Sequence, residues 1–358
     1  MSKTLLALSA CAAALSLACA AQAADSKAGA VPMTGFGKPD LSGIWTNQSL
    51  TPLARAKPGG PLEVDEATAK KMADAMAIAG IDDPSFKNAK YSDPNAGAPP
   101  KGDKDFGTKG YDSGWVTPGE NLGKVNGKYR TSDIVEPASG QIPYKDLAAA
   151  AKRAQARGIA YVTGNSPYEN PEETAISERC LIGFGGTGGP GMLSVLYNNN
   201  YQFVLTKDTL AIDVEMAHDV RLIPIFDSAA KAQANHRPAV IKPWLGDSVA
   251  WWEGPTLVVE TTNVNPLQGE NHPFYLTPTG KVTERLTRKS EKEIAYSFTV
   301  DDPATYTQVW KAELTFYPSP GVYEYACHEG NYGLEGILAG ARAKEREQAS
   351  AVKPQAAK

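Results

Sequence analysis

A long run of β-patterned segments between residues 192 and 333 limits the fold more than any other feature. Apolar and polar residues alternate along these segments, as expected for strands with one buried face. Antiparallel strands about every ten residues, with no helix between them, predict a closed barrel or a strongly curled sheet. The expected strands lie within Met192–Thr206, Thr209–Phe226, Val249–Glu253, Thr256–Thr262, Val282–Thr287, Glu293–Val300, Thr307–Phe316 and Val322–Cys327.

The rest of the chain is rich in turns and carries three predicted helices. Many of the 33 Gly and 26 Pro lie in the N-terminal half, which predicts a loop-rich region wrapped around the sheet. Apolar spacing and capping residues predict helices over Asp65–Ala79, Tyr144–Arg157 and Leu334–Ala349. The pattern Gly43-Ile44-Trp45 is typical of the first strand of a lipocalin-like barrel, although a buried Trp on an edge strand is an alternative.

These elements predict a β-rich α+β fold that forms one folded unit over residues 38–349. Residues 24–37 are expected to be a flexible lead-in, and residues 38–191 a loop-rich wrapping region with two helices. Residues 192–333 are the antiparallel β region, and residues 334–358 a C-terminal helix and tail. The expected shape is a curled antiparallel sheet or a lipocalin-like barrel.

The first 23 residues have the features of an export signal. Lys3 supplies the positive start, Leu5–Ala21 is apolar and small, and Ala21-Gln22-Ala23 fits a signal-peptidase site. A lipoprotein box at Leu8–Cys11 would leave too short an apolar stretch, so we expect a cleaved signal. No later stretch is apolar and long enough to span a membrane. The expected location is the periplasm or the extracellular medium.

Charge and cysteine count narrow the partners and the compartment. The chain has 36 Lys and Arg against 40 Asp and Glu, and loss of Lys3 with the signal changes the formal charge from −4 to −5. This acidic balance argues against a nucleic-acid partner. Cys180 and Cys327 are the cysteines of the mature chain and are expected to pair in an oxidising compartment. A reactive thiol at Cys327 beside His328 is the alternative.

Histidines and their acidic neighbours are the candidates for chemistry. His218, His272 and His328 each stand near an acid or an amide, and imidazole titrates near working pH. The predicted residues of a general acid–base site are His218, Asp219, His272, His328, Glu329 and Glu215. The alternative is that the histidines are structural and hydrogen-bonded at strand ends. None of the histidines has a neighbour at metal-motif spacing. No cofactor is therefore predicted, while a divalent metal held by three histidines stays open.

A second group of residues is suited to holding a ligand. Glu215 would be a base with a raised pKa if its side of the strand faced a barrel lumen, and a surface acid otherwise. Arg221 could bind an anionic group, while the amides and aromatic rings could equally form a turn and a core. The predicted ligand-binding residues are Arg221, Asn198, Asn199, Asn200, Tyr201, Trp244 and Trp252. The glycine run Gly185–Gly191 is not followed by a helix start or a Lys, so we interpret it as a closely packed loop.

Several motifs together resemble a large, mostly uncharacterised family of exported bacterial proteins. The motifs are Pro39–Trp45, Arg130–Ser132, Glu178–Cys180, Tyr197–Gln202, Met216–Arg221, Trp244–Ser248, Trp252–Val259, Thr261–Asn263 and Tyr325–Tyr332. The resemblance covers most of the mature chain and implies a secreted or periplasmic β-rich fold, without supplying catalytic residues. Gly254-Pro255 stands where other members have Gly-Asp, which changes the turn alone.

The sequence therefore favours a periplasmic enzyme that acts on a small, partly apolar or aromatic molecule. The expected chemistry is acid–base, of lyase, isomerase or hydrolase type. The alternative is a lipocalin-like binding protein of the cell envelope without catalysis, and a structural envelope protein is a third reading. The expected partner is a small molecule, and the oligomeric state stays open.

Overall fold

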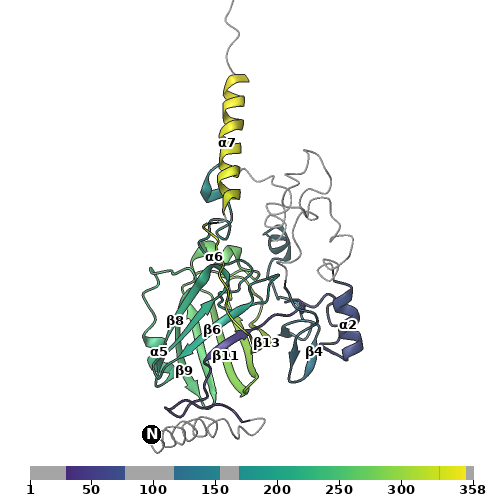
Figure 1. Cartoon of the computed structure of the whole chain (residues 1–358), viewed down its shortest axis with the longest axis vertical. Helices are drawn as coiled ribbons and strands as arrows, with labels where there is room; N and C mark the ends of the chain where they lie inside the picture. Colours follow the sequence, from purple (N-terminus) through teal and green to yellow (C-terminus); the bar gives the residue numbers. More distant parts are fainter. Residues whose placement is uncertain (1–29, 77–116, 154–168, 330, 352–358) are drawn as a thin grey trace, which may run out of the picture.

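The computed structural model describes residues 30–76, 117–153, 169–329 and 331–351, and its largest element is a closed β-barrel (Figure 1). Nine strands close the barrel through the pairing of β1 with β13, and β5 adds to the outer edge of β13. The expected β-rich α+β barrel is thus confirmed. The strands, in the order of the sheet, are β1 (Gly43–Thr46), β6 (Asn200–Leu205), β7 (Thr209–Val214), β8 (Asp219–Phe226), β9 (Asp247–Glu253), β10 (Thr256–Thr262), β11 (Lys281–Ser290), β12 (Glu293–Asp301), β13 (Trp310–Pro318) and β5 (Ile134–Glu136).

Strand β1 closes the barrel and contains the predicted Gly-x-Trp pattern. It pairs antiparallel with β6 along its whole length and with β13 at Trp45–Pro318 and Thr46–Tyr317. The Trp45 ring is 2% exposed and donates from Nε1 to the carbonyl of Leu41. The Arg288 guanidinium lies 4.4 Å from the centre of that ring, a cation–π contact. The pattern therefore marks the first barrel strand, as predicted.

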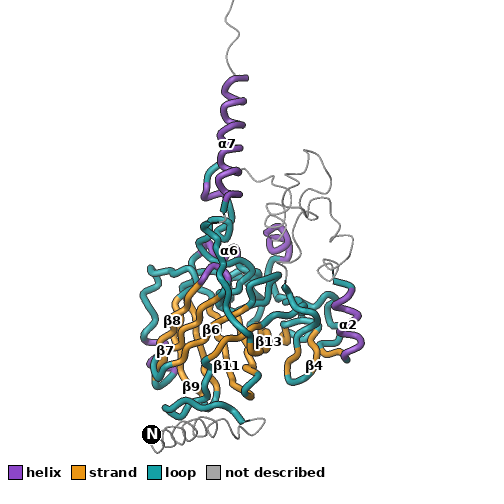
Figure 2. Tube along the Cα trace, viewed as in Figure 1, coloured by secondary structure: helices purple, strands orange, loops and turns teal. Residues whose placement is uncertain are grey.

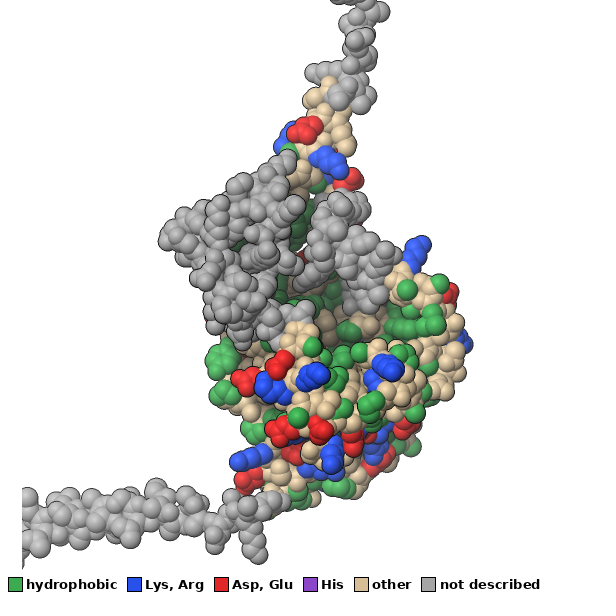
Figure 3. Space-filling model, turned by 90° about the vertical axis from the view of Figure 1, so that its right-hand side faces the viewer, with side chains coloured by type: hydrophobic (Ala, Val, Ile, Leu, Met, Phe, Trp, Pro, Cys, Tyr) green, Lys and Arg blue, Asp and Glu red, His purple; other side chains and the backbone are tan. Residues whose placement is uncertain are grey.

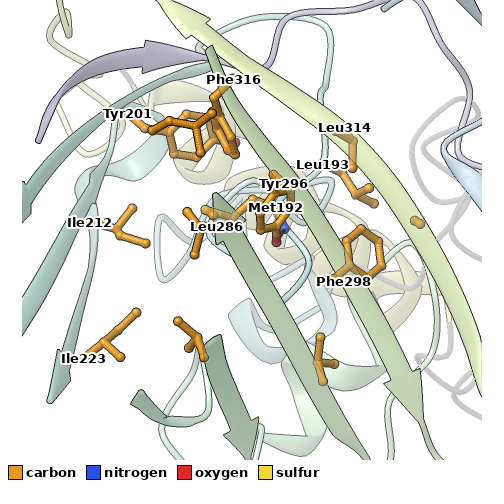
Figure 4. Close-up of a cluster of buried hydrophobic side chains, with 14 of the residues drawn as sticks. Met192, Leu193, Tyr201, Ile212, Ile223, Leu286, Tyr296, Phe298, Leu314 and Phe316 are labelled. Carbon is orange, nitrogen blue, oxygen red and sulfur yellow. Dashed lines mark hydrogen bonds between the residues drawn. The ribbon is translucent and has the colours of Figure 1, made fainter. Parts of the chain in front are cut away.

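The barrel interior is packed with large side chains. Tyr201, Tyr296, Phe298 and Phe316 are at most 1% exposed. Figure 4 shows Met192 reaching toward Tyr296, and Tyr201 lying beside Phe316. The rings of Tyr201 and Phe316 meet edge to face at 5.2 Å. Because these side chains fill the interior, the barrel has a solid core at this level.

A small sheet and a helix lie beside the barrel (Figure 2). The sheet has β2 (Glu63–Val64), β4 (Lys128–Arg130) and β3 (Lys124–Val125), with β4 in the middle. Helix α2 (Glu66–Asp74) begins where the Asp65 carboxylate accepts the Thr68 N–H at 2.7 Å, the N-cap that the sequence predicted. The helix ends at Asp74, where the capping Ala75 N–H bonds to the carbonyls of Lys71 and Ala73, so the end predicted at Ala79 is wrong. The end of the helix seen over 147–153 lies outside the described residues.

One expected strand is wrong in part, and another is wrong altogether. The region expected to begin at Met192 forms its first strand only at Asn200, because Met192–Val195 instead crosses the core and Met192 is fully buried. The segment Val322–Cys327 forms no strand. Strand β13 already pairs with β12 on one side and with β1 and β5 on the other, so no edge of β13 is left for it.

The remaining described elements are short, apart from the last helix. They are η3 (Pro171–Glu173), η4 (Met216–His218), α5 (Ala229–Ala234), α6 (Pro266–Asn271) and α7 (Tyr332–Ala351). Helix α7 extends away from the barrel, and Figure 3 shows acidic and basic side chains interspersed on one face of the barrel below it. Among the described residues, none of the helices has the length and apolar character that a membrane crossing requires.

Candidate functional site: a cleft where two barrel strands separate

The barrel wall is split between β8 and β9. These strands run parallel and pair at Ile225–Ala250 and Phe226–Trp251. Before these pairs the two strands line opposite sides of a cleft of about 420 Å³. A volume of this size is typical of small-molecule sites, which measure about 300–1,000 Å³.

The cleft has apolar walls and several polar groups. The apolar lining residues are Leu181, Val220, Leu222, Pro224, Pro243, Trp244, Leu245 and Val249. The polar lining residues are Asp219, Arg221, Asn235, Arg237, Asp247 and Ser248. Asp219, Arg221 and Trp244 are the residues predicted from the sequence that line it. The others were missed, because they belong to no catalytic or binding motif.

Strand β8 did carry a signal for the cleft in its alternation. Val220 and Leu222 are 53% and 70% exposed, whereas Arg221 between them is 4% exposed. An ordinary barrel strand places its apolar residues inside and its charged residues outside. Strand β8 reverses this pattern at the point where it separates from β9. A charged residue that faces inward between apolar residues that face outward therefore indicates the position of the cleft.

Arg221 is held by a buried carboxylate. Its Nη1 donates to Glu284 Oε1 at 3.0 Å and its Nη2 to Glu284 Oε2, and Nη2 also donates to Thr261 Oγ1 at 3.2 Å. Although burial opposes ionisation, attraction and hydrogen bonds from Arg221 hold the pKa of Glu284 below its ordinary value. The expected anion-binding role of Arg221 is therefore weakened, because Glu284 already neutralises its charge. The Arg221 Nε–H is buried and has no protein partner among the described residues.

Asp219 is the cleft residue whose pKa is shifted toward neutral pH. Its Oδ2 accepts the Gly183 N–H at 2.8 Å. Burial raises the pKa of Asp219 to about 6, opposed by the Gly183 N–H and by nearby His218. A carboxyl group with this pKa can exchange a proton near neutral pH and can either donate or accept a hydrogen bond.

The glycine-rich loop 185–191 packs against Asp219 and against the Arg221–Glu284 ion pair. A Cβ on Gly188 would lie 3.3 Å from Asp219 Oδ2, and one on Gly189, whose φ is +81°, would lie 2.8 Å from Arg221 Nη1. The Gly191 N–H and the Tyr296 hydroxyl both donate to Glu284 Oε1. The loop therefore needs glycines because it passes very close to other groups. These groups are mainly side chains, whereas we expected close packing against backbone.

The three histidines expected to converge lie in different surroundings. His218 is exposed, has a φ of +51°, and accepts the Tyr325 N–H at Nε2. His328 and its neighbour Glu329 are exposed. His272 is 1% exposed and packs on the Phe274 ring at 4.1 Å. None of the three lines the cleft, so they are not part of this candidate site.

The described part of the structure does not form the three-histidine metal site that the sequence left open. Among the described residues, no group of three or more His, Cys, Asp or Glu side chains could hold a metal ion.

His236 supports one wall of the cleft. Its Nδ1 lies 2.8 Å from Asp247 Oδ2, and its Nε2 lies 3.4 Å from Glu260 Oε1. The Arg237 N–H donates to the same Asp247 oxygen at 2.7 Å. These contacts hold the start of the segment 236–246, which carries Trp244 to the cleft.

The asparagine run forms a turn whose amides are already engaged. Asn198 has a φ of +55°, and its Nδ2 donates to Glu215 Oε1 at 3.0 Å. The Asn200 N–H donates to Glu215 Oε2, and Asn199 bonds with both backbone groups of Val195. Glu215 is therefore an internal turn acceptor that does not face a lumen. The Tyr201 hydroxyl is also engaged, since it donates to the Thr187 carbonyl at 3.2 Å.

The tryptophans do not form one cluster. Trp251 packs outside the barrel with Ala232, Val249 and Val258. Trp252 is the next residue of the strand, so it points to the opposite face, where Lys38 Nζ lies 5.5 Å from its ring. Trp244 alone of the three lines the cleft.

A disulfide connects Cys180 with Cys327, as predicted. The bond joins the C-terminal segment to the chain just before the cleft residue Leu181. Asn331 adds to this junction, because its Nδ2 donates to the carbonyl of Glu178 at 2.6 Å. One end of the cleft wall is thus fixed covalently.

Comparison with known proteins gave no match: no family model fits the chain, and neither a curated protein nor a solved structure matches it. A barrel supports many functions, so the fold alone does not specify one. The function has to be argued from the cleft.

Proposed function

We propose that the protein binds a small, partly apolar molecule in the cleft between β8 and β9. The observation that carries this proposal is the cleft itself, about 420 Å³ in volume, with apolar walls and polar groups at Asp219, Arg221 and Ser248. Apolar walls supply affinity, and a few placed polar groups supply orientation. Because the charge of Arg221 is neutralised by Glu284, the preferred ligand is uncharged and offers hydroxyl or carbonyl groups.

Export to an oxidising compartment, such as a bacterial periplasm, belongs to the same proposal. A disulfide between Cys180 and Cys327 is stable in such a compartment and rare in a reducing cytosol. The signal-like residues 1–23 support the same location. The protein would then meet its ligand in the cell envelope or outside the cell.

Acid–base catalysis in the same cleft is a second candidate, and Asp219 favours it. A pKa of about 6 places this carboxyl near the working pH of a general acid or base. The reaction would be a proton transfer to or from the bound molecule. His272, His328 and Glu329 have no role in this version, because they lie outside the cleft.

Binding of the neutral dye N-phenyl-1-naphthylamine tests the site. We expect the dye to gain fluorescence with the wild-type protein and to bind at least about tenfold more weakly to Leu222→Asp, a loss of about 1.4 kcal/mol. Val309→Asp is the matched control, because Val309 is also an exposed apolar residue (50%) and does not line the cleft. Equal binding by both variants would contradict the proposal.

Asp219→Asn separates the two candidate functions once a ligand is identified. A pure binding protein should retain affinity within a few-fold and lose the pH dependence of binding near pH 6. An enzyme should retain binding but lose turnover by about 10²–10⁴-fold, the usual contribution of a general acid or base. Turnover that survives the substitution would remove Asp219 from the chemistry.

A further inference from the structure

A second, smaller pocket lies between the barrel and the small sheet. It is lined by residues from three parts of the fold: Asn47 follows β1, Arg130 ends β4, and Thr315 lies in β13. Its volume open to water is about 20 Å³. One water molecule needs about 10–15 Å³, so the pocket holds one water and excludes larger organic molecules.

Two buried polar atoms in the residues around this pocket have no protein partner among the described residues. They are Asn47 Oδ1 and Arg130 Nε, in residues that are 2% and 7% exposed. The Thr315 hydroxyl on the same wall interacts with the side chain of Tyr317. Buried polar groups are almost always hydrogen-bonded in native proteins, so two such atoms around one small pocket indicate a missing common partner.

Other contacts hold two of these side chains in place. Asn47 Nδ2 donates to the Met192 carbonyl and to the Tyr201 hydroxyl, both at 3.3 Å. Arg130 Nη1 lies 3.1 Å from Glu63 Oε1, and Nη2 lies 3.6 Å from Glu313 Oε2. The remaining atoms, Asn47 Oδ1 and Arg130 Nε, cannot turn to other partners without breaking these contacts.

The chemistry of the two atoms selects the occupant. Asn47 Oδ1 requires a donor and Arg130 Nε–H requires an acceptor. An anion without a proton cannot donate to Asn47, and a metal cation cannot accept from Arg130, whose charge would also repel it. Burial raises the pKa of Asp133 on the pocket wall, which disfavours the carboxylate that a cation would need. Water both donates and accepts, and it has the right size.

We propose that this pocket is a binding site for one ordered water molecule. The water accepts from Arg130 Nε and donates to Asn47 Oδ1. It thereby connects the end of β1 with the small sheet. The site is independent of the cleft and of its proposed ligand.

Crystals of the full mature protein, grown without additive ions and then soaked in bromide or rubidium, test the occupant. We expect one water peak within about 2.7–3.2 Å of both atoms in unsoaked crystals. We expect no anomalous peak in the pocket after either soak. A bromide peak would identify an anion site, and a rubidium peak a cation site, and either would overturn the proposal. So would side chains that close over the pocket with no peak.

Discussion

Glu284 and Asp219 lie in two differently built parts of the same barrel, and their pKa values shift in opposite directions. Glu284 is in β11, which pairs with β12 continuously from Lys281–Asp301 to Arg288–Ile294. Its carboxylate is fully enclosed and has Arg221, Tyr296 and Gly191 as donors, so its pKa is lowered. Asp219 begins β8, where pairing with β9 is missing, and its pKa is raised to about 6.

The difference shows that partners, and not depth, decide which buried acid can do chemistry. The deeper group, Glu284, is fixed as a carboxylate because an arginine and a tyrosine satisfy it. The shallower group, Asp219, accepts one backbone N–H and lies near His218, and these two influences do not offset the effect of burial on its pKa. Where the strands pair continuously, the buried acid is fixed as a carboxylate. Where β8 and β9 separate, the acid keeps a pKa near neutral pH and can titrate.

Removing the charge of Glu284, the partner of Arg221 in the continuously paired wall, should have the largest effect on the free energy of unfolding. In Glu284→Gln the buried Arg221 loses its counter-charge, so we expect a loss of about 3–5 kcal/mol in the free energy of unfolding. Urea denaturation measures it. Glu253→Gln is the control, because Glu253 pairs with Arg285 in a half-exposed ion pair that should be worth less than about 1 kcal/mol. Similar losses in both variants would contradict the distinction between the two regions.

Removing the disulfide beside the cleft should lower the free energy of unfolding slightly less. Cys180→Ser combined with Cys327→Ser removes a bridge between residues 147 apart, for which we expect a loss of about 2–5 kcal/mol. The Gly183 N–H that holds Asp219 lies close to this bridge, so dye binding in the cleft should weaken as well. Unchanged dye binding in a folded double variant would show that the wall is held without the bridge.

Asp219 should make stability depend on pH with an unusual sign. The unfolded chain releases this proton near pH 3.8, whereas the folded protein keeps it until about pH 6. Between these values the native state binds more protons, so its stability falls as pH rises, by about 1–2 kcal/mol over the window after allowance for partial exposure. Asp219→Asn should flatten this part of the profile, measured by denaturation at each pH. An unchanged slope would assign the pH dependence to another group.

Trp244→Ala should have the smallest effect on stability. The side chain is half-buried at the cleft, so we expect a loss of less than about 1 kcal/mol in the free energy of unfolding. Dye affinity should nevertheless fall about tenfold, because an apolar wall is removed. Isothermal titration with N-phenyl-1-naphthylamine gives the affinity. A large stability loss with normal binding would make Trp244 a core residue.

Much of the barrel could be predicted from alternation alone. The period of two placed β7, the β9–β10 hairpin, β11 and β12 correctly, and the Gly-x-Trp pattern identified β1. The strand expected at Val322–Cys327 failed because its alternation is real but every edge of β13 is occupied. Strand pairing is a property of the whole sheet, which a local pattern does not contain.

The candidate site was predicted less well, for a related reason. Asp219, Arg221 and Trp244 were chosen for their residue types and do line the cleft, whereas His272 and His328 were chosen on the same basis and do not. Residue type shows which chemistry is available, but position depends on where β8 and β9 part. That separation depends on pairings between residues about 25 positions apart in the chain.

The parallel pairing of β8 with β9 also has a consequence for how this barrel could diversify. Parallel neighbours cannot be joined by a tight hairpin, so residues 227–246 must cross over outside the barrel. The far end of this crossover supplies Asn235, Arg237, Trp244 and Leu245 to the cleft, while all the antiparallel ladders are built elsewhere. The crossover is therefore an exchangeable module, in which insertions and substitutions could change the ligand while the barrel is inherited intact.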